Sequence, residues 1–304
     1  MKRRVNGFIR LSRYREYLFF VIITTLLGAI AGHGEFGWRL LGILAANWLA
    51  VAFAFMINDV EDAPDDALNP DKVMRNPVSA NDISRRQAQV ASWIVAAIAA
   101  LLYALVGLVP FLIGLATIIL GFMYSWRGFN IRLKNKPFLD LASHCMLLAG
   151  FQFLSAYFSF TPTYFLQWFF PFLMVVCISL YGELYNELRD LDGDREAGLA
   201  HTGIFLGYKL TYWLMMICLV VGTIAGIITF FVIWLAPLWV VLMIFALLGV
   251  LFIPAFIKLR KSRSSLEAQK YLQRPIEIAA ALGLLAQLVY PWAARLIQMR
   301  VFGF

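Results

Sequence analysis

The sequence predicts an all-α membrane protein, a bundle of nine transmembrane helices, and three observations support this fold class. Hydrophobic residues make up 62% of the 304 positions and charged residues only 14%, whereas a soluble domain is closer to half apolar and a quarter charged. Apolar runs long enough to cross a bilayer, roughly 20 residues each, recur along the whole chain. The polar stretches between these runs are short, so no separate soluble domain is expected.

Each predicted span is an apolar run bounded by polar or helix-breaking residues. Pro64 is expected to end the second helix, because proline lacks an amide hydrogen and clashes with the preceding turn. The Ser84 hydroxyl can cap the third helix, and Gly222 and Gly226 form a G-x-x-x-G that favours close packing of the seventh. The nine expected spans cover residues 17–33, 40–61, 86–106, 108–125, 139–160, 164–188, 209–231, 233–257 and 277–298.

The chain is expected to form one domain, residues 1–304, with a possible internal repeat of residues 40–160 and 164–298. In each half an acidic cluster closes the first span, and a basic stretch follows two spans later. Both halves have the same predicted orientation. This pattern favours a parallel duplication with the chemistry at the interface of the halves, as in some transporter folds.

The placement of basic residues predicts the orientation in the membrane. Of the 26 Lys and Arg residues, only Arg39, Arg295 and Arg300 fall on one side or at its helix ends. By the positive-inside rule the other side is cytoplasmic, which places the N-terminus there, in the cell membrane. The net charge of +8 is thereby accounted for, and the basic residues form no stripe on a soluble domain that would indicate nucleic-acid binding.

Two clusters of carboxylates close the second and sixth predicted spans, where a membrane protein should least favour them. A four-residue spacing places side chains on one face of a helix. Two such faces are costly unless a cation or a positive partner lies between them. Both clusters have the spacing N-x-x-x-D-x-x-x-D, with the residues Asn58, Asp62 and Asp66 in the first and Asn186, Asp190 and Asp194 in the second.

Carboxylate and amide oxygens without a nearby His or Cys favour a hard cation. Mg²⁺ is typically held by one or two carboxylates together with substrate phosphate oxygens, so two facing clusters could hold two Mg²⁺ ions bridged by a diphosphate. Nearby Arg and Lys side chains would complete the anion clamp. If the diphosphate carries a hydrocarbon tail, the apolar bundle can hold that tail. The allylic C–O bond between tail and diphosphate could then ionise within a pocket that limits access of water.

Two motifs carry a family resemblance. Asn58-Asp59-x-x-Asp62-x-x-x-Asp66 matches N-D-x-x-D-x-x-x-D, and Asp190 to Gly198 is similar to D-x-x-x-D-R-x-x-G. In this order, at the ends of the second and sixth spans, they resemble the motifs of the UbiA superfamily of intramembrane prenyltransferases. Further segments extend the resemblance over essentially the whole chain: Arg10-Leu11-Ser12-Arg13, Arg75 to Ser84, Tyr124-Ser125 with Arg132-Leu133-Lys134, and His201 to Gly207.

The chain departs from the family pattern at three positions. Tyr14 replaces a proline in the opening segment, Asn76 stands where arginine precedes the proline, and Asn81 stands where glycine is usual. The second departure leaves open whether Lys72 or Arg75 contacts diphosphate.

The resemblance implies Mg²⁺-dependent transfer of a prenyl group from a polyprenyl diphosphate to a lipophilic acceptor within the membrane. It also implies nine helices around a central cavity with a cytoplasmic cap. Family acceptors include quinone precursors, chlorophyll-type pigments, carotenoids and lipid glycerol ethers. The stretch from Arg132 to His144 resembles carotenoid-elongating members. The motifs indicate which leaving group is bound but not which nucleophile attacks, so they do not identify the acceptor.

The candidate site residues fall into four groups. The metal ligands are expected to be Asn58, Asp62, Asp66, Asn186, Asp190 and Asp194, and the four aspartates among them are the catalytic candidates. The diphosphate-binding candidates are Arg13, Lys72, Arg75, Tyr124, Arg132 and Lys134. Glu183, within the sixth span, is the candidate on the acceptor side.

Each assignment has a plainer reading. The basic candidates also serve as orientation signals, Tyr124 could belong to an interfacial aromatic belt, and Asp59, Asp65 and Asp192 are as easily solvated as functional. His144 is more typical of a satisfied core histidine, and His201 is expected at the interface.

Two other function classes compete with the enzyme: a cation-coupled transporter that uses intramembrane carboxylates, and a non-catalytic isoprenoid-binding protein. A transporter more often buries charge at mid-bilayer, whereas these clusters lie at span ends.

Overall fold

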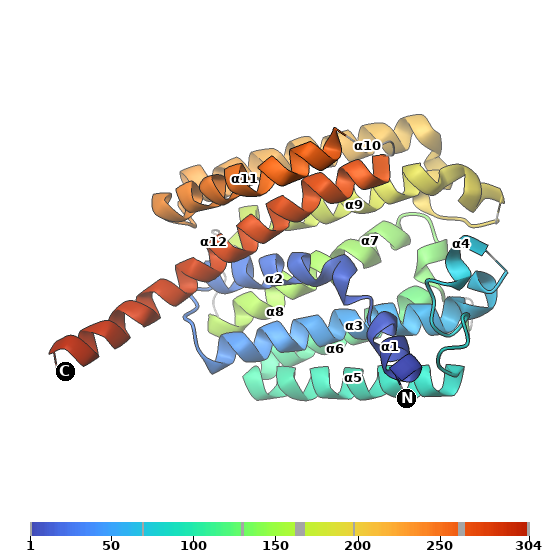
Figure 1. The fold of residues 1–304 in the computed structure, drawn as a ribbon, viewed down its shortest axis with the longest axis horizontal. Coiled ribbons are helices and arrows are strands. Elements are labelled where there is room, and N and C mark those ends of the chain that lie inside the picture. Colours follow the sequence, from blue (N-terminus) through green and yellow to red (C-terminus); the bar gives the residue numbers. More distant parts are fainter. Residues whose placement is uncertain are drawn as a thin grey trace.

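In the computed structural model, every regular element of the described residues is a helix (Figure 1). The structure describes residues 2–68, 70–128, 131–161, 168–196, 198–260 and 265–302. Within these ranges nine helical segments are long and apolar enough to cross a membrane, so the predicted all-α bundle of nine spans is confirmed. The elements are α1 (Lys2–Leu11), α2 (Tyr14–Ala31), α3 (Trp38–Asp66), α4 (Pro70–Val73), α5 (Arg85–Val106), α6 (Leu108–Ser125), η2 (Leu133–Asn135), α7 (Leu139–Cys145), η3 (Met146–Gly150), α8 (Phe151–Phe160), α9 (Phe169–Glu196), α10 (Thr202–Ile227), η5 (Ile228–Val232), α11 (Leu238–Leu259) and α12 (Ser265–Phe302).

The two helices that carry the acidic clusters run further than predicted. α3 continues to Asp66 instead of ending near 61, and α9 continues to Glu196 instead of 188. The prediction that Pro64 ends its helix is wrong, because α3 continues two residues past it. A proline this close to the helix end removes a single backbone hydrogen bond. All six predicted metal ligands therefore lie on helices.

Both acidic clusters lie at the same end of the bundle. The C-terminal ends of α3 and α9 lie on the right in Figure 1, together with α4 and the connections that lead into α7 and α10. α5 begins at this end with the predicted cap: the Ser84 hydroxyl accepts a hydrogen bond from the Gln87 amide, and the Gln87 side chain accepts one from the Ser84 amide. The opposite end carries the C-terminal part of α12, which extends beyond the other helices (Figure 1).

Close helix packing holds the bundle together. α3 packs against α5 and α6, α9 against α10, and α12 against α11 and α2. A methyl group added to Gly222 of α10 would lie 3.0 Å from Cβ of Cys177 on α9. The predicted role of the glycine pair in close packing is thereby confirmed.

One fully buried amide joins four helices inside the membrane. The Asn47 side chain of α3 donates to the Thr25 hydroxyl of α2 (2.8 Å) and to the Gln152 carbonyl of α8 (2.9 Å). Its oxygen accepts hydrogen bonds from the Tyr103 hydroxyl of α5 (2.7 Å) and the Ser155 hydroxyl of α8 (2.8 Å). Both donors and both acceptor positions are used, so this polar group is buried without an unsatisfied atom.

Candidate functional site

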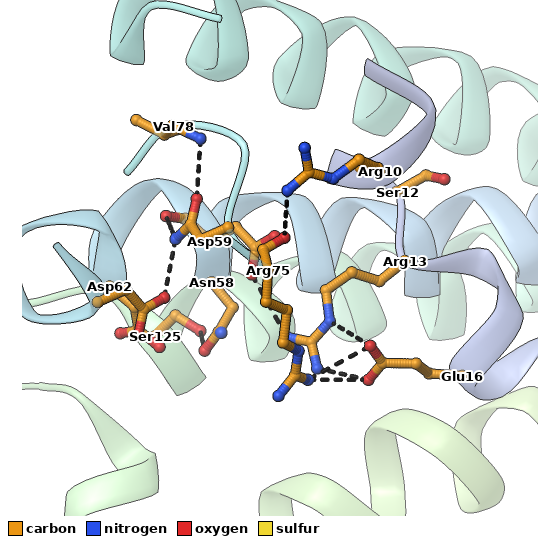
Figure 2. A network of polar contacts seen from close by, with 12 residues as sticks. Arg10, Ser12, Arg13, Glu16, Asn58, Asp59, Asp62, Arg75, Val78 and Ser125 are labelled. Atoms are coloured by element: carbon orange, nitrogen blue, oxygen red, sulfur yellow. Dashed lines mark hydrogen bonds and ion pairs between the residues drawn. The ribbon is translucent and has the colours of Figure 1, made fainter. Parts of the chain in front are cut away.

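The first acidic cluster converges on one ammonium group. Asn58 and Asp62 lie one turn apart on α3, and Lys134 reaches them from the short turn η2. The Lys134 Nζ atom lies 2.9 Å from Oδ1 of Asn58 and 2.6 Å from Oδ1 of Asp62. The Ser125 hydroxyl, at the end of α6, donates to the same Asn58 oxygen at 3.1 Å (Figure 2). The four-residue spacing therefore delivers amide and carboxylate oxygens to a common point.

A second basic group lies beside this point. Arg132 places Nη2 2.8 Å from Oδ1 of Asp62 and 3.5 Å from Oδ2 of Asp65, which also pairs with Arg127. The Asp62 and Arg132 side chains are each only 16% exposed. Burial lowers the pKa of the Lys134 ammonium, an effect that the Asp62 carboxylate opposes. Two of the predicted diphosphate ligands, Arg132 and Lys134, thus meet the first predicted metal cluster.

The departure at Asn76 has a structural role that sequence reasoning missed. The buried Asn76 amide donates to Oδ2 of Asp66 at 2.9 Å and to the backbone carbonyl of Asp59 at 2.7 Å. Its oxygen accepts a hydrogen bond from the Val78 amide at 3.0 Å. The loop after α4 is thereby fixed to the end of α3, and the Asp66 carboxylate is oriented by a neutral donor.

Asp59 faces a different partner from Asp62. Its carboxylate is 3% exposed, and its Oδ1 lies 3.3 Å from Nη1 of Arg13. Arg13 occupies the junction of α1 and α2 with a left-handed backbone (φ 46°), a strained conformation for a residue with a side chain. Its guanidinium also stacks 4.8 Å above the Phe55 ring. The open reading of Asp59 as a solvated residue is thus wrong: it forms a buried ion pair.

Arg75 and Lys72, the two alternatives for the diphosphate contact, lie further out. The exposed Arg75 pairs with Glu16, which also binds Arg13 (Figure 2). Lys72 is exposed and forms no ion pair within the described part of the chain. The structure brings neither of them to the first cluster.

In the second cluster an arginine, and not a lysine, contacts both an amide and a carboxylate. Arg189 of α9 donates from Nη2 to Oδ2 of Asp190 at 2.6 Å and from Nη1 to Oδ1 of Asn186 at 3.1 Å. The Asp190 side chain is 49% exposed, so it is far more accessible than Asp62. The two clusters are therefore alike in spacing but differ in burial.

His201 holds the last carboxylate of the second cluster. It lies directly before the span that begins at Thr202, and it is only 7% exposed. Its Nε2 lies 3.2 Å from Oδ2 of Asp194, and its Nδ1 lies 3.5 Å from Oε2 of Glu187. Burial by itself lowers the pKa of His201, but the two carboxylates outweigh it and raise the pKa to about 9.

Behind His201, buried polar groups connect α7, α9 and α10. Ligand atoms of Asp140, Glu187 and His201 lie within 4.8 Å of one another. The Asp140 carboxylate already accepts from the amide and the hydroxyl of Thr202, and Glu187 accepts from the Gly203 amide at 2.7 Å. These carboxylates satisfy the free amides at the start of α10, the usual role of acidic groups at a helix N-terminus.

Glu183, the acceptor-side candidate, lies one turn before Glu187 on α9. The Tyr124 hydroxyl lies 3.4 Å from its Oε1, and Nδ1 of His144 lies 3.4 Å from its Oε2. Tyr124, predicted to bind diphosphate, therefore contacts the acceptor-side carboxylate and not the first cluster.

At one end of the apolar bundle, the site thus places carboxylate and amide oxygens next to arginine and lysine side chains. Among the described residues, three buried atoms of this site have no hydrogen-bond partner: Oδ2 of Asp59, Nε of Arg132 and Nδ1 of His201. Such an arrangement can bind a cation through its oxygens and an anion through its nitrogens at adjacent points.

Comparisons with known proteins agree with this arrangement. Residues 20–279 match the UbiA prenyltransferase family. A lycopene elongase/hydratase from Haloarcula japonica is 30% identical over 220 residues, which cover 69% of this chain and 70% of that protein. A digeranylgeranylglyceryl phosphate synthase from Methanothermobacter thermautotrophicus is 27% identical over 209 residues, 68% of this chain and 69% of that protein.

The fold is also similar to solved structures. A UbiA homolog from Archaeoglobus fulgidus bound to GPP and Mg²⁺ superimposes with a TM-score of 0.69 at 18% identity. The superposition covers 93% of this chain and 98% of the other.

Proposed function

The chain belongs to the UbiA prenyltransferase family, and from this membership we propose that it transfers a prenyl group from a polyprenyl diphosphate to a lipophilic acceptor in an Mg²⁺-dependent reaction. It is an integral membrane protein and a prenyltransferase. The transporter alternative is set aside, because the family consists of transferases. The observation that carries the proposal is the convergence of Asn58 and Asp62 on one positive charge beside Arg132.

The donor set fits Mg²⁺. Two oxygens from Asn58 and Asp62 lie within 3 Å of a single ammonium nitrogen, so they already favour a positive charge at that point. All six proposed ligands offer hard oxygen atoms, which Mg²⁺ prefers over nitrogen or sulfur. We propose two ions, one for each cluster; when bound, they would neutralise charge on the diphosphate oxygens.

The basic residues would bind the other charge. Arg132 and Lys134 present donors next to the first cluster, and the unpartnered Nε of Arg132 is free to donate to a phosphate oxygen. Cationic groups held in a buried site stabilise the electron pair that the leaving diphosphate takes with it. We retain Arg13, Lys72, Arg75 and Tyr124 as further candidates for binding the diphosphate.

The partners follow from the same proposal. The donor tail would lie among the apolar helices, with the diphosphate at the cytoplasmic end of the cell membrane, as the positive-inside rule indicates. The named relatives point to carotenoids and to prenylated glycerol phosphates as acceptors to test first. We propose that residues 1–304 act as one domain around a central cavity.

The experiment is diphosphate release by the purified protein in lipid vesicles. With geranylgeranyl diphosphate as donor, and lycopene or geranylgeranylglyceryl phosphate as acceptor, we expect release that requires Mg²⁺ and a prenyl-sized mass increase in one acceptor. Removal of Mg²⁺ with EDTA should abolish both signals. A protein that releases no diphosphate with either acceptor present would contradict the proposal.

Asn76→Ala is expected to weaken the metal site without unfolding the protein. The Asp66 carboxylate would lose the neutral donor that orients it, and residues that orient a metal ligand typically contribute roughly 10–100-fold to metal affinity or activity. The measurement is the Mg²⁺ concentration that gives half-maximal diphosphate release. The matched control is Asn81→Gly, because Asn81 is an exposed residue of the same loop whose left-handed backbone (φ 55°) glycine adopts without strain. Equal values for the two variants would contradict the assignment.

A further inference from the structure

The antiparallel helices α7 and α9 pair their polar residues at two levels. At the outer level Asp140 and Glu187 lie close together with His201. Four residues further along α7, and four residues earlier on α9, His144 and Glu183 form the second pair, with Nδ1 3.4 Å from Oε2. Four helical residues advance about 6 Å, so this second pair lies about 6 Å further into the bundle.

The inner pair is connected to the first metal cluster by adjacent residues of α6. Tyr124 places its hydroxyl 3.4 Å from Oε1 of Glu183, while the next residue, Ser125, donates to Asn58. The Glu183 and His144 side chains are 15% and 18% exposed, so they are mostly buried but not sealed off. An acid and a histidine thus lie one step inward from the charged end of the site.

This depth matters for the reaction. In a prenyl diphosphate the reacting carbon is bonded to a diphosphate oxygen, so it must lie next to the phosphate-binding groups and on their apolar side. Ionisable residues inside a membrane segment are costly and mark functional sites by default. The outer pair is accounted for by its hydrogen bonds to the start of α10, whereas the inner pair caps no helix.

We propose that Glu183, positioned by His144, accepts the proton that the acceptor loses when it captures the prenyl group; this rests on the proposed function. The C–O bond breaks and its electron pair leaves with the diphosphate. A new bond forms from the acceptor to the prenyl carbon, and the hydrogen of the attacked carbon or oxygen passes as a proton to the Glu183 carboxylate. The substrate class is therefore an acceptor with a removable proton at the reacting atom.

The test separates ionisation of the donor from its transfer. Glu183→Gln keeps the size of the side chain but removes its basicity. With geranylgeranyl diphosphate and either lycopene or geranylgeranylglyceryl phosphate, we expect diphosphate release within about 3-fold of the wild-type rate. We expect prenylated product to fall by roughly 10²-fold or more, the usual contribution of a general base, with free prenyl alcohol in its place.

Three variants complete the design. Glu183→Asp should recover part of the transfer, and His144→Gln should lower the ratio of product to released diphosphate by a smaller factor. Glu196→Gln, an exposed position on the same helix, is the matched control and should keep the wild-type ratio. Thermal unfolding in detergent checks that each variant is folded.

The outcomes distinguish the two proposals. If Glu183→Gln transfers the prenyl group like the wild type, with the same ratio of product to released diphosphate, the inference about Glu183 is overturned and the proposed function stands. An equal loss of product and diphosphate release in that variant also overturns it, because such a loss indicates a structural or donor-binding role. A wild-type protein that releases no diphosphate contradicts the proposed function and, with it, the inference.

Discussion

Replacement of Asp62 by asparagine is expected to lower Mg²⁺-dependent diphosphate release by roughly 10²–10³-fold, the cost of removing one preorganised charge-stabilising group. Asp62 is the residue on which Lys134 and Arg132 both converge, and it offers oxygens to the same point as Asn58. Asparagine has the same shape and can still accept a hydrogen bond from Lys134. The loss should therefore come from the missing negative charge and not from altered packing.

Two measurements check this expectation. Diphosphate release is followed in vesicles, and binding of Mn²⁺, used as a paramagnetic substitute for Mg²⁺, is followed by electron paramagnetic resonance. Asp192→Asn is the matched control, because Asp192 is exposed and its position, two residues from Asp190, falls on another face of the helix. If Asp62→Asn bound Mn²⁺ and released diphosphate like the control, Asp62 would not be a metal ligand.

Among the substitutions considered, replacement of Asn47 by leucine is expected to produce the largest loss in the free energy of unfolding. The change removes four hydrogen bonds and leaves the Tyr103 hydroxyl and the Gln152 carbonyl without this partner inside the bundle. Each unsatisfied buried group costs about 1–3 kcal/mol, although hydrogen bonds within membranes average nearer 0.6 kcal/mol. We therefore expect a loss of about 2–5 kcal/mol in the free energy of unfolding.

Unfolding in mixed micelles with increasing dodecyl sulfate measures this loss. Tyr103→Phe removes one of the four bonds and should cost about 1 kcal/mol or less. Thr117→Val is the control: this buried hydroxyl donates to the carbonyl of Ile113 in its own helix. A leucine variant as stable as Thr117→Val would show that the amide does not hold the helices together.

Much of the candidate site could be predicted because its spacing is local. Asn58, Asp62 and Asp66 repeat at every fourth position, so any helix there must place them on one face. The same holds for Asn186, Asp190 and Asp194 on α9. Arg132 and Lys134 were predicted from a motif, and the structure brings both to Asp62.

Other site residues could not be predicted, since their roles depend on partners far away in the sequence. Asn76 was known from the sequence only as a departure from the family pattern, yet it reaches back to Asp66 at the end of α3. His201 was expected at the membrane interface, but nothing near it in the sequence indicated that it would contact both Asp194 and Glu187. No local pattern distinguishes a polar residue in a loop that faces water from one that folds back onto a helix end.

The nine spans and the two helical faces of oxygen ligands follow from local sequence, because hydrophobic length and four-residue spacing act within one helix. Which charges meet depends instead on tertiary packing. It paired Asp59 with Arg13 and Glu183 with His144, and it left Lys72 in solvent. These pairings depend on how separate helices and loops pack at one end of the bundle, where burial makes an unpaired charge costly and so selects the partners.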